Sequence, residues 1–197
     1  MNRRKLYCII TDMQNNKEIN SRNKYEIRKA VMSDIDEVTE KYNDVIDYVS
    51  QLPFVCRWEK GVYPTYETAL KAINEESLFV LVLDGKIAAS AVFNNEYTKT
   101  YDKADWGIDL SYDDIIVIHT VAVHPSYLKL GLGRAMTMFS VEYAKSLNKK
   151  AVRLDAAQQN IPANALYRSC GFTHVDTVDL EFGVEGFKWS ELYQMLI

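Results

Sequence analysis

The spacing of hydrophobic residues changes several times along this chain, and each change marks the boundary of a predicted element. Apolar residues three and four positions apart predict helices over residues 35–50, 66–75 and 132–147, with a further helix between Asn160 and Gly171. Alternating or uniformly apolar runs predict strands over residues 25–30, 78–83, 86–93, 115–123, 151–155, 172–180 and 187–196. The pair Asp84-Gly85, between two of these strands, is typical of a hairpin turn.

The N-terminal region has a different pattern. Residues 6–10 form a short apolar run that fits a strand, whereas residues 12–23 are polar and rich in asparagine. We therefore expect residues 1–23 to be a partly flexible extension and residues 24–197 to form one domain. Ser33 and Thr65 are the expected N-caps of the first two helices, because their side-chain oxygens can accept hydrogen bonds from free backbone N–H groups.

The stretch from Ile115 to Arg134 combines a strand, a loop and the start of a helix. Its β-branched run ends at His124-Pro125-Ser126, because proline offers no N–H to a strand ladder. Gly131 and Gly133 then open an amphipathic helix. Glycines at this position leave backbone N–H groups uncovered at the positive end of the helix dipole. The stretch therefore predicts a binding site for an anion such as a diphosphate.

This stretch resembles the acyl-CoA site of the GNAT N-acetyltransferase superfamily, whose motif reads Gln/Arg-x-x-Gly-x-Gly/Ala. The motif falls on Leu128-Lys129-Leu130-Gly131-Leu132-Gly133, and both glycines match. Leu128 departs from it, since the family has Gln or Arg there, and this puts one side-chain contact to the phosphates in doubt. Lys129 or Arg134 can supply the charge instead.

A second segment is similar to the same superfamily. It follows the pattern Asn-x-x-Ala-x-x-x-Tyr and then Gly-Phe, with matches at Asn160, Ala163, Tyr167, Gly171 and Phe172. Both motifs occur in the order and at the spacing that the family shows. The resemblance extends over residues 25–197.

The resemblance implies an α/β (α+β) fold of the GNAT type. It implies a mixed central sheet of about seven strands, splayed between the fourth and fifth strands and flanked by about four helices. Acetyl-CoA is the implied co-substrate, with its pantetheine arm in the gap between the splayed strands, and no metal is implied. The residues expected to bind acetyl-CoA are Val121, Ala122, Val123, Leu128, Lys129, Leu130, Gly131, Leu132, Gly133, Arg134, Asn160, Ala163 and Tyr167.

The implied reaction is direct attack of a primary amine on acetyl-CoA. By the resemblance, the backbone of residues 121–123 pairs with the pantetheine amides as a strand would, and Asn160 hydrogen-bonds the same arm. Tyr167 would protonate the leaving thiolate, since a phenol is neutral at pH 7 and can donate to a sulfur anion as it forms. The alternative is that Tyr167 is only a core aromatic.

A base must remove a proton from the acceptor amine, because amines are mostly protonated in water. His119 is the expected base, since imidazole titrates near neutrality. Its spacing predicts that it shares a strand face with Val121 and Val123. Members of the family that acetylate aryl-alkyl amines look similar here, with a histidine on this strand. The alternative is a buried neutral histidine satisfied by a carbonyl, and the rival bases are Glu96, Asp109, Asp113 and Asp114.

The acceptor pocket is expected from residues 52–66 and 94–110, which are rich in bulky side chains. Trp58, Tyr63, Tyr66 and Trp106 are the predicted lining, with Asp105 or Asp109 facing a cationic amine. The alternative is that these aromatics close the outer core. The long acidic and aromatic segment favours a closed pocket and hence a small-molecule acceptor.

Composition narrows the classes of function further. The chain has 197 residues, 48% of them hydrophobic, and a net charge of −4, which gives no support for a nucleic-acid or anionic-membrane partner. Cys8, Cys56 and Cys170 form no zinc spacing, and no apolar run is long enough for a membrane helix. We therefore expect a cytoplasmic protein without a metal. Edge strands near the C-terminus are compatible with a homodimer.

Other classes of function remain open at this point. A dinucleotide-binding oxidoreductase would use Gly131 and Gly133 with Asp155 on the next strand, but Met136 stands where the third glycine belongs. A non-catalytic acyl-CoA-binding protein of the same fold would need no catalytic tyrosine. Among enzymes, a protein or peptide amine is the alternative to a small-molecule acceptor.

Overall fold

The computed structural model of the protein describes residues 25–52, 56, 58–183 and 188–197. The predicted strand at residues 6–10, the polar segment at residues 12–23 and the start of the last predicted strand at Phe187 lie outside the described residues.

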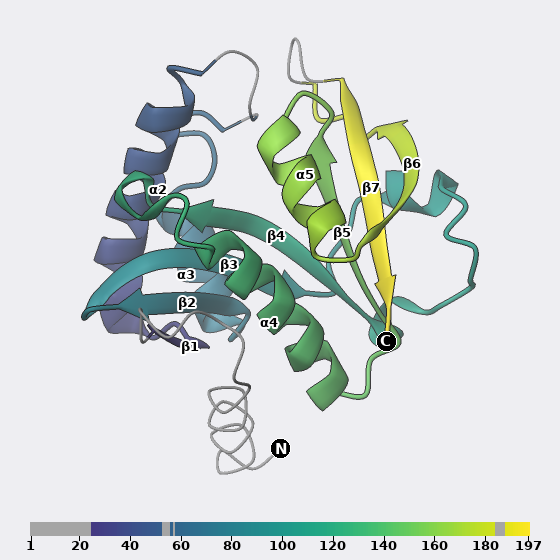
Figure 1. Ribbon diagram of the computed structural model, residues 1–197, viewed down its shortest axis with the longest axis horizontal. Coiled ribbons are helices and arrows are strands. Elements are labelled where there is room, and N and C mark those ends of the chain that lie inside the picture. Colours follow the sequence, from purple (N-terminus) through teal and green to yellow (C-terminus); the bar gives the residue numbers. More distant parts are fainter. Residues whose placement is uncertain (1–24, 53–55, 57, 184–187) are drawn as a thin grey trace.

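These residues form a seven-stranded mixed sheet in the order β1-β2-β3-β4-β5-β7-β6 (Figure 1). Neighbouring strands are antiparallel except β4 and β5, which are parallel. The predicted mixed sheet is confirmed, and it differs from the doubly wound parallel sheet of a dinucleotide-binding enzyme. The strands are β1 Tyr25–Lys29, β2 Leu78–Leu83, β3 Lys86–Asn94, β4 Ile115–Val123, β5 Ala151–Ala157, β6 Thr173–Asp179 and β7 Trp189–Leu196.

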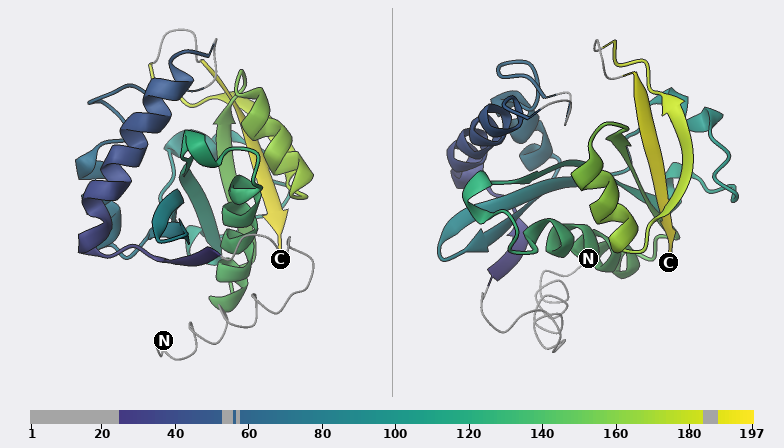
Figure 2. Two further views of the ribbon diagram at one scale, coloured as in Figure 1. Left: turned by 60° about the vertical axis from the view of Figure 1, so that its left-hand side comes forward. Right: turned by 45° about the horizontal axis from the view of Figure 1, so that its top comes forward.

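Helices cover both faces of the sheet. α2 (Ile35–Val49) and α3 (Tyr66–Asn74) lie on one face, and α4 (Leu132–Ser146) and α5 (Ile161–Ser169) lie on the other (Figure 2). Each pair buries its apolar side against the sheet. The α4–α5 core has Leu81, Ile118, Met136 and Leu154 among its most buried residues, and the α2–α3 core has Val38, Tyr42, Ala69 and Val80. None of the helices in the described part of the chain is long and apolar enough to cross a membrane.

Of the two predicted N-caps, Thr65 is confirmed and Ser33 is wrong. Thr65 is the N-cap of α3, and its Oγ1 accepts from the Thr68 N–H at 3.4 Å, as predicted. Ser33 is not a cap, because the 3₁₀ turn η1 (Met32–Asp34) precedes α2. Asp34 is the N-cap of α2, but its side chain makes no capping hydrogen bond to the helix. Its carboxylate instead accepts from the Val31 N–H at 2.8 Å and from Arg28 at 2.6 Å.

Residues 95–114 form a packed layer and not a free loop. They contain two 3₁₀ turns, η2 (Lys99–Lys103) and η3 (Tyr112–Asp114), and lie behind β5 and β7 in the view of Figure 1. Tyr101, only 1% exposed, joins a third core on the sheet face opposite α4 and α5. We call this group the insertion core; its other buried residues are Ala104, Ile115, Val117, Ala151, Leu180 and Leu192.

A lysine is enclosed within the α2–α3 side of the molecule. Lys41 on α2 is 2% exposed, its Nζ donates to the hydroxyl of Ser90, and it lies 4.9 Å from the centroid of the Tyr42 ring. Burial lowers its pKa well below the ordinary 10.5, against a smaller opposing effect of Glu37.

Replacing Lys41 by Met should therefore stabilise the protein. The unfolded chain binds a proton here up to about pH 10.5, whereas the folded chain releases it at lower pH, so the wild-type free energy of unfolding rises with pH between the two values. We expect Lys41→Met to gain about 1–3 kcal/mol at pH 7 and to flatten this rise, because it removes the cost of burying an amine. Urea denaturation at pH 7 and pH 9 measures both effects. Lys86→Met, at an exposed strand end, is the control, and an equal gain in both variants would contradict the argument.

Candidate active site

β4 and β5 are paired only along their first halves. The ladder runs from Ile115 opposite Ala151 to Ile118 opposite Leu154, and the strands then separate (Figure 1). This is the splay predicted between the fourth and fifth strands. We call the space beyond the last pair the β4–β5 opening.

The register brings two polar side chains to the start of this opening. Ile118 and Leu154, the last partners, both pack in the α4–α5 core. Successive strand residues point to opposite faces, so the next residues, His119 and Asp155, both point to the other face. A histidine and a carboxylate thus face the same side of the sheet, one on each strand.

A β-bulge in β4 then changes the face on which residues lie. The β3–β4 register shifts, and Thr120 adopts a φ of 51°. Before the bulge Val117, on the His119 side, belongs to the insertion core; after it Val121 and Val123 pack against the α4–α5 core. The prediction that His119 shares a face with Val121 and Val123 is wrong, because the bulge inverts the alternation.

Beyond the bulge, one edge of β4 lacks a neighbouring strand within the described residues. Ala122 pairs with β3, and the N–H of His124 donates to the carbonyl of Ala88 at 2.9 Å. Alternate residues direct their N–H and C=O groups to opposite edges of a strand, so those of Val121 and Val123 face the opening. An extended ligand with amide groups can pair with this edge as an additional strand, whereas the backbone of Ala122 is occupied by β3.

The geometry of His119 defines its tautomer. Its Nε2 lies 3.0 Å from the carbonyl oxygen of Glu96, which can only accept, so Nε2 carries the hydrogen and Nδ1 has the lone pair. Burial lowers the pKa of the imidazole below 6.5, and the charge of Asp155 opposes this with a smaller effect. His119 is therefore neutral at pH 7. The Glu96 carbonyl accepts the hydrogen on Nε2, as expected if His119 were only a buried neutral histidine. Nδ1, however, can still accept a proton.

Asp155 is the charged group around which the other polar side chains of the opening gather. Its Oδ1 accepts a hydrogen bond from the hydroxyl of Tyr101 at 2.6 Å. Its charge also raises the pKa of Tyr63, Tyr101 and Tyr167, in each case adding to a larger effect of burial. These groups come from β5, the loop before α3, the insertion and α5, so four separate parts of the chain meet here.

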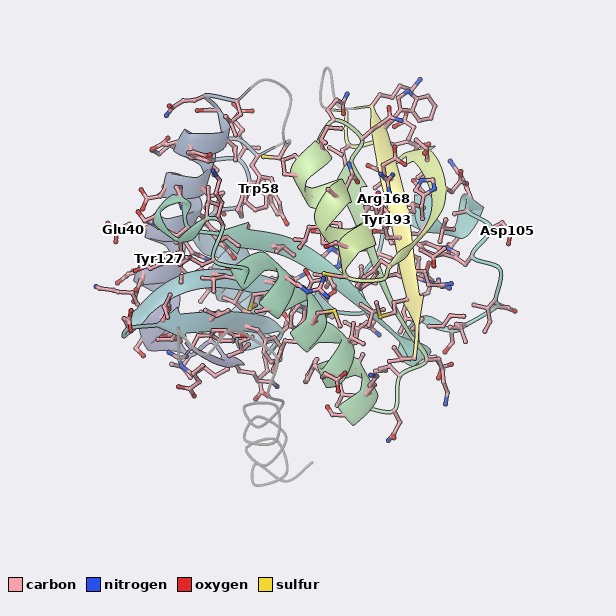
Figure 3. The ribbon with its side chains drawn as sticks, in the orientation of Figure 1. Glu40, Trp58, Asp105, Tyr127, Arg168 and Tyr193 are labelled. Atoms are coloured by element: carbon pink, nitrogen blue, oxygen red, sulfur yellow. The ribbon has the colours of Figure 1, made fainter. Side chains whose placement is uncertain are left out.

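Tyr167 lies on the α5 side of the opening. It is 6% exposed, and its ring packs 5.9 Å from the ring of Tyr193 and 6.4 Å from that of Phe172. Burial, followed by the charge of Asp155, raises the pKa of its phenol well above 10. Tyr167 therefore keeps its proton at neutral pH. Figure 3 shows Tyr193 and Arg168 on this side and Trp58 on the α2 side.

The start of α4 presents backbone donors next to the opening. Gly131 is the N-cap with a φ of 79°, and a Cβ added there would meet no atom within 4 Å. A Cβ on Gly133 would lie 3.2 Å from Leu166 of α5 and 3.7 Å from Val123 of β4, so this glycine permits close packing of α4. The first N–H groups of the helix have no intrahelical acceptor, and the loop Leu128–Leu130 before them is exposed.

The two cations of this loop have different surroundings. Lys129 is exposed and has a φ of 65°. Arg134 donates from its guanidinium to the carbonyl of Ser169 at 2.7 Å, at the end of α5. The Arg134 side chain is thus engaged in holding α5 against α4, which leaves Lys129 as the cation beside the helix start.

Asn160 is the N-cap of α5. Its Oδ1 accepts from the N–H of Ala163 at 3.2 Å. This contact holds the asparagine between the end of β5 and the first turn of α5.

The predicted acceptor pocket is divided between two places. Tyr63 bonds to the hydroxyl of Thr120 at the bulge, and its ring is 6.5 Å from that of Trp58 in an edge contact. These two belong to the opening, and Tyr66 is 41% exposed nearby on α3. Trp106 instead stacks 4.0 Å from the guanidinium of Arg153.

Trp106 belongs to a different hollow, a pocket of about 440 Å³ formed by the insertion itself. Its lining includes Asp105 and Asp109, together with Arg153 from β5. The prediction that Trp106, Asp105 and Asp109 share one pocket with Trp58 and Tyr63 is wrong, because the insertion pocket is lined by the first three and not by the other two. The Trp106 indole N–H donates to the backbone carbonyl of Tyr101, in the insertion core, at 2.8 Å.

The rival bases have other partners. Glu96 pairs with Lys71 at 2.7 Å, and Asp114 accepts from the Ser111 hydroxyl at 2.8 Å. Asp113 accepts from the Asn95 amide at 3.3 Å, and Asp109 lines the insertion pocket. Across the described residues, no three His, Cys, Asp or Glu side chains are arranged to hold a metal ion.

The sequence analysis named Asp155 only for the dinucleotide-binding alternative and did not identify Tyr101 as a site residue. The one available signal was the alternation along β5, in which Arg153 and Asp155 flank buried Leu154 and so lie together on the opposite face of the strand. The parallel register with β4, which sets Asp155 opposite His119, is a long-range pairing that the spacing within either strand does not reveal.

Comparison with known proteins agrees with this geometry. Residues 44–172 match the family model described as the acetyltransferase (GNAT) family, and this range contains both β4 and the first turns of α4 and α5. A mycothiol acetyltransferase of Pseudarthrobacter chlorophenolicus is 32% identical over 105 residues, which are 53% of this chain. The match spans only 30% of the length of that relative.

Solved structures share the fold at low sequence identity. An acetyltransferase of the GNAT family from Streptococcus agalactiae superposes with a TM-score of 0.75 and 17% identity, covering 88% of this chain and 95% of the other. The acetyltransferase YncA from Salmonella typhimurium, solved with acetyl-CoA as its cofactor, has a TM-score of 0.64 and 20% identity, covering 87% of this chain and 93% of that one.

Proposed function

The chain belongs to the acetyltransferase (GNAT) family, and we propose that it transfers the acetyl group of acetyl-CoA directly to a primary amine of a small molecule. One observation carries this proposal. The β4–β5 opening joins an unpaired strand edge, a glycine-led helix N-terminus, a neutral histidine and a protonated tyrosine.

The residues at the opening fit acetyl-CoA. The free N–H groups at the start of α4, with Lys129 beside them, suit the diphosphate. The β4 edge at Val121 and Val123 suits the amides of the pantetheine arm, and Asn160 suits the same arm from the other side. When bound, acetyl-CoA supplies an acetyl group activated as a thioester. The similarity of YncA, solved with acetyl-CoA, supports this assignment.

His119 serves as the base. An amine that reaches the opening as an ammonium ion must lose one proton before its nitrogen can form a bond to carbon. Nδ1 of His119 accepts that proton, because Nε2 is already committed to the Glu96 carbonyl. The resulting imidazolium lies in the field of Asp155, which favours the charged form.

Tyr167 serves as the acid. Its phenol keeps its proton at neutral pH, and it donates that proton to the sulfur that leaves when the new amide bond forms. Tyr167 belongs to the α4–α5 core, whereas His119 and Asp155 face the opposite side of the sheet. Proton acceptor and proton donor therefore approach the opening from opposite faces.

The acceptor is a small molecule in this proposal. Tyr63 and Trp58 form an aromatic wall where the bulge meets the α2–α3 side, which suits a compact body. The similarity over 105 residues to a mycothiol acetyltransferase supports the same class.

A panel of acceptors tests the proposal. The purified protein is incubated with acetyl-CoA and polyamines, amino acids, aryl-alkyl amines, aminoglycosides or peptides, and CoA release and acetylated product are measured. Turnover of a small amine is the expected result. Acetylation of peptides alone would indicate a protein acetyltransferase, and acetyl-CoA binding with no turnover at all would indicate a non-catalytic binding protein. Either outcome would overturn the proposal.

Gly131→Ala should weaken acetyl-CoA binding. The residue has a φ of 79°, so alanine costs about 1 kcal/mol of stability, and its methyl group would project into the open space where the diphosphate is expected. We expect the dissociation constant from calorimetry to rise by about tenfold, or about 1.4 kcal/mol. Gly85→Ala has the same kind of strain, with a φ of 77° in a remote hairpin, and should leave affinity unchanged. Equal effects of both changes on affinity would contradict the assignment.

Tyr167→Phe should reduce kcat by about 100-fold, because it removes the proton donor to the leaving thiolate. The dissociation constant of acetyl-CoA should stay within about twofold, since the ring and its packing remain. Steady-state kinetics and calorimetry measure the two quantities. Tyr143→Phe on α4 is the control. An unchanged kcat in Tyr167→Phe would show that this phenol is not the acid.

The activity should persist at mildly acidic pH. His119 accepts a proton only in its neutral form, so kcat falls as pH drops through the pKa of this residue in the folded enzyme. Because burial lowers that pKa, the fall should lie below pH 6.5. A pH profile of kcat from pH 5 to 8 locates it, and His119→Gln should remove it. A fall centred above pH 6.5, or one that survives in His119→Gln, would refute the role of this residue.

A further inference from the structure

The insertion pocket is a hollow that the proposed reaction does not use. Its volume of about 440 Å³ lies within the roughly 300–1,000 Å³ that is usual for small-molecule sites. Its lining comes from the insertion and, at one point, from Arg153 of β5. Figure 3 shows Asp105, one of its lining residues, at the outer edge of the molecule and away from Trp58. The pocket is therefore separate from the β4–β5 opening.

One wall of the pocket is a buried cation. Arg153 is 2% exposed, its guanidinium lies 4.0 Å from the centroid of the Trp106 ring, and its Nε donates to Gln194 at 2.9 Å. Burial lowers the pKa of this arginine, against smaller effects of Tyr112 and Tyr101, and the guanidinium stays charged at neutral pH. Its Nη2, however, is buried and has no hydrogen-bond acceptor in the described part of the chain. Because such a donor is costly, an acceptor oxygen brought by a ligand is favourable here.

Three carboxylates surround the exposed side of the same pocket. Asp102, Asp105 and Asp109 are all exposed lining residues. Asp102 accepts from the hydroxyl of Tyr112 and Asp105 from the N–H of Gly107, each at 2.9 Å. The pocket thus has a positive group at its buried side and negative groups at its exposed side.

The rest of the lining is largely apolar. Ala104 is part of the insertion core, Leu110 packs against it, and Ile108 is 41% exposed. An apolar group of a ligand placed against Ile108 would remove this surface from water.

These charges restrict the ligand to one kind of molecule. An anion that reached Arg153 would pass three carboxylates that repel it, and a simple cation would leave Nη2 without an acceptor. A molecule with a carboxylate and an ammonium group close together satisfies both sides. Arginine pairs particularly well with carboxylates, since its planar guanidinium matches their geometry.

We propose that the insertion pocket is a second binding site, which takes a free α-amino acid with an apolar side chain. The carboxylate of the amino acid pairs with Arg153, its ammonium group faces Asp105 and Asp109, and its side chain packs on Ile108. This site goes beyond the proposed acetyl transfer and does not depend on it.

Ligands that lack one charge test the inference in the wild-type protein. L-leucine, L-valine and L-phenylalanine are titrated by calorimetry, each beside the amine without its carboxylate and the acid without its ammonium group. For leucine these are 3-methylbutylamine and 4-methylpentanoate. At least one amino acid should bind saturably with a dissociation constant below about 1 mM, and both of its analogues should bind at least about 10-fold more weakly. No saturable binding of any of the three, or an analogue that binds as tightly as its amino acid, would overturn the proposal.

Two variants test the residues. Arg153→Gln should weaken binding of the amino acid by at least about 10-fold, because it removes the charge that pairs with the carboxylate. Asp109→Asn should weaken it by about twofold to fivefold, as expected for an exposed ion pair. Asp113→Asn is the matched control, since Asp113 is an exposed carboxylate of the insertion outside the pocket. Equal effects of Asp109→Asn and Asp113→Asn would contradict the site. If Arg153→Gln does not fold, Asp109→Asn and the analogues decide.

The place of binding must also be measured, because amino acids are candidate acceptors at the β4–β5 opening. In ¹⁵N-labelled protein, the bound amino acid should shift the resonances of the Trp106 indole N–H and the Gly107 amide, which belong to lining residues of the pocket. The amides of Val121 and Val123, at the opening, should stay unchanged. Shifts at Val121 and Val123 without any at Trp106 and Gly107 would assign the ligand to the opening and overturn the proposal.

Discussion

The separation of β4 from β5 is the constraint on which the rest of the site depends. A parallel pair of strands normally satisfies its backbone groups along its whole length, but here the ladder stops at Ile118 and Leu154. The bulge at Thr120 then turns the second half of β4 so that Val121 and Val123 pack on the α4 side while their backbone faces the opening. Among the described residues this edge has no partner strand, so a ligand that carries its own amides can pair with it.

The charge states of the histidine and tyrosine side chains at the opening follow from their burial. Removing groups from water favours their neutral forms, so the imidazole of His119 and the phenols of Tyr101 and Tyr167 are uncharged at pH 7. The Asp155 carboxylate accepts a hydrogen bond from Tyr101 of the insertion. The opening thus contains a proton acceptor on β4 (His119), a proton donor on α5 (Tyr167) and a carboxylate on β5 (Asp155).

The local elements were predictable from the sequence because their signals are local. The strand Ile115–Val123, the hairpin at Asp84-Gly85 and the Thr65 cap follow from residue types within a few positions of one another. The face of His119 was predicted wrongly, because a single residue with positive φ inverts the alternation on which the prediction depended. Asp155 was named only for the dinucleotide-binding alternative because its position opposite His119 arises from a parallel pairing 36 residues apart, and the insertion was placed in the wrong pocket because only tertiary packing shows which residues line each one.

The central claim is that acetyl-CoA binds along the edge of β4 and at the start of α4. Residue-resolved hydrogen exchange, with and without acetyl-CoA, tests it most directly, because the N–H groups of Val121 and Val123 face an edge with no partner strand among the described residues, and those of the first turn of α4 precede any intrahelical acceptor. The account predicts that acetyl-CoA slows exchange at these amides and leaves those of the insertion at residues 95–114 unchanged. Binding without protection at Val121, Val123 and the start of α4, or no binding at all, would contradict it.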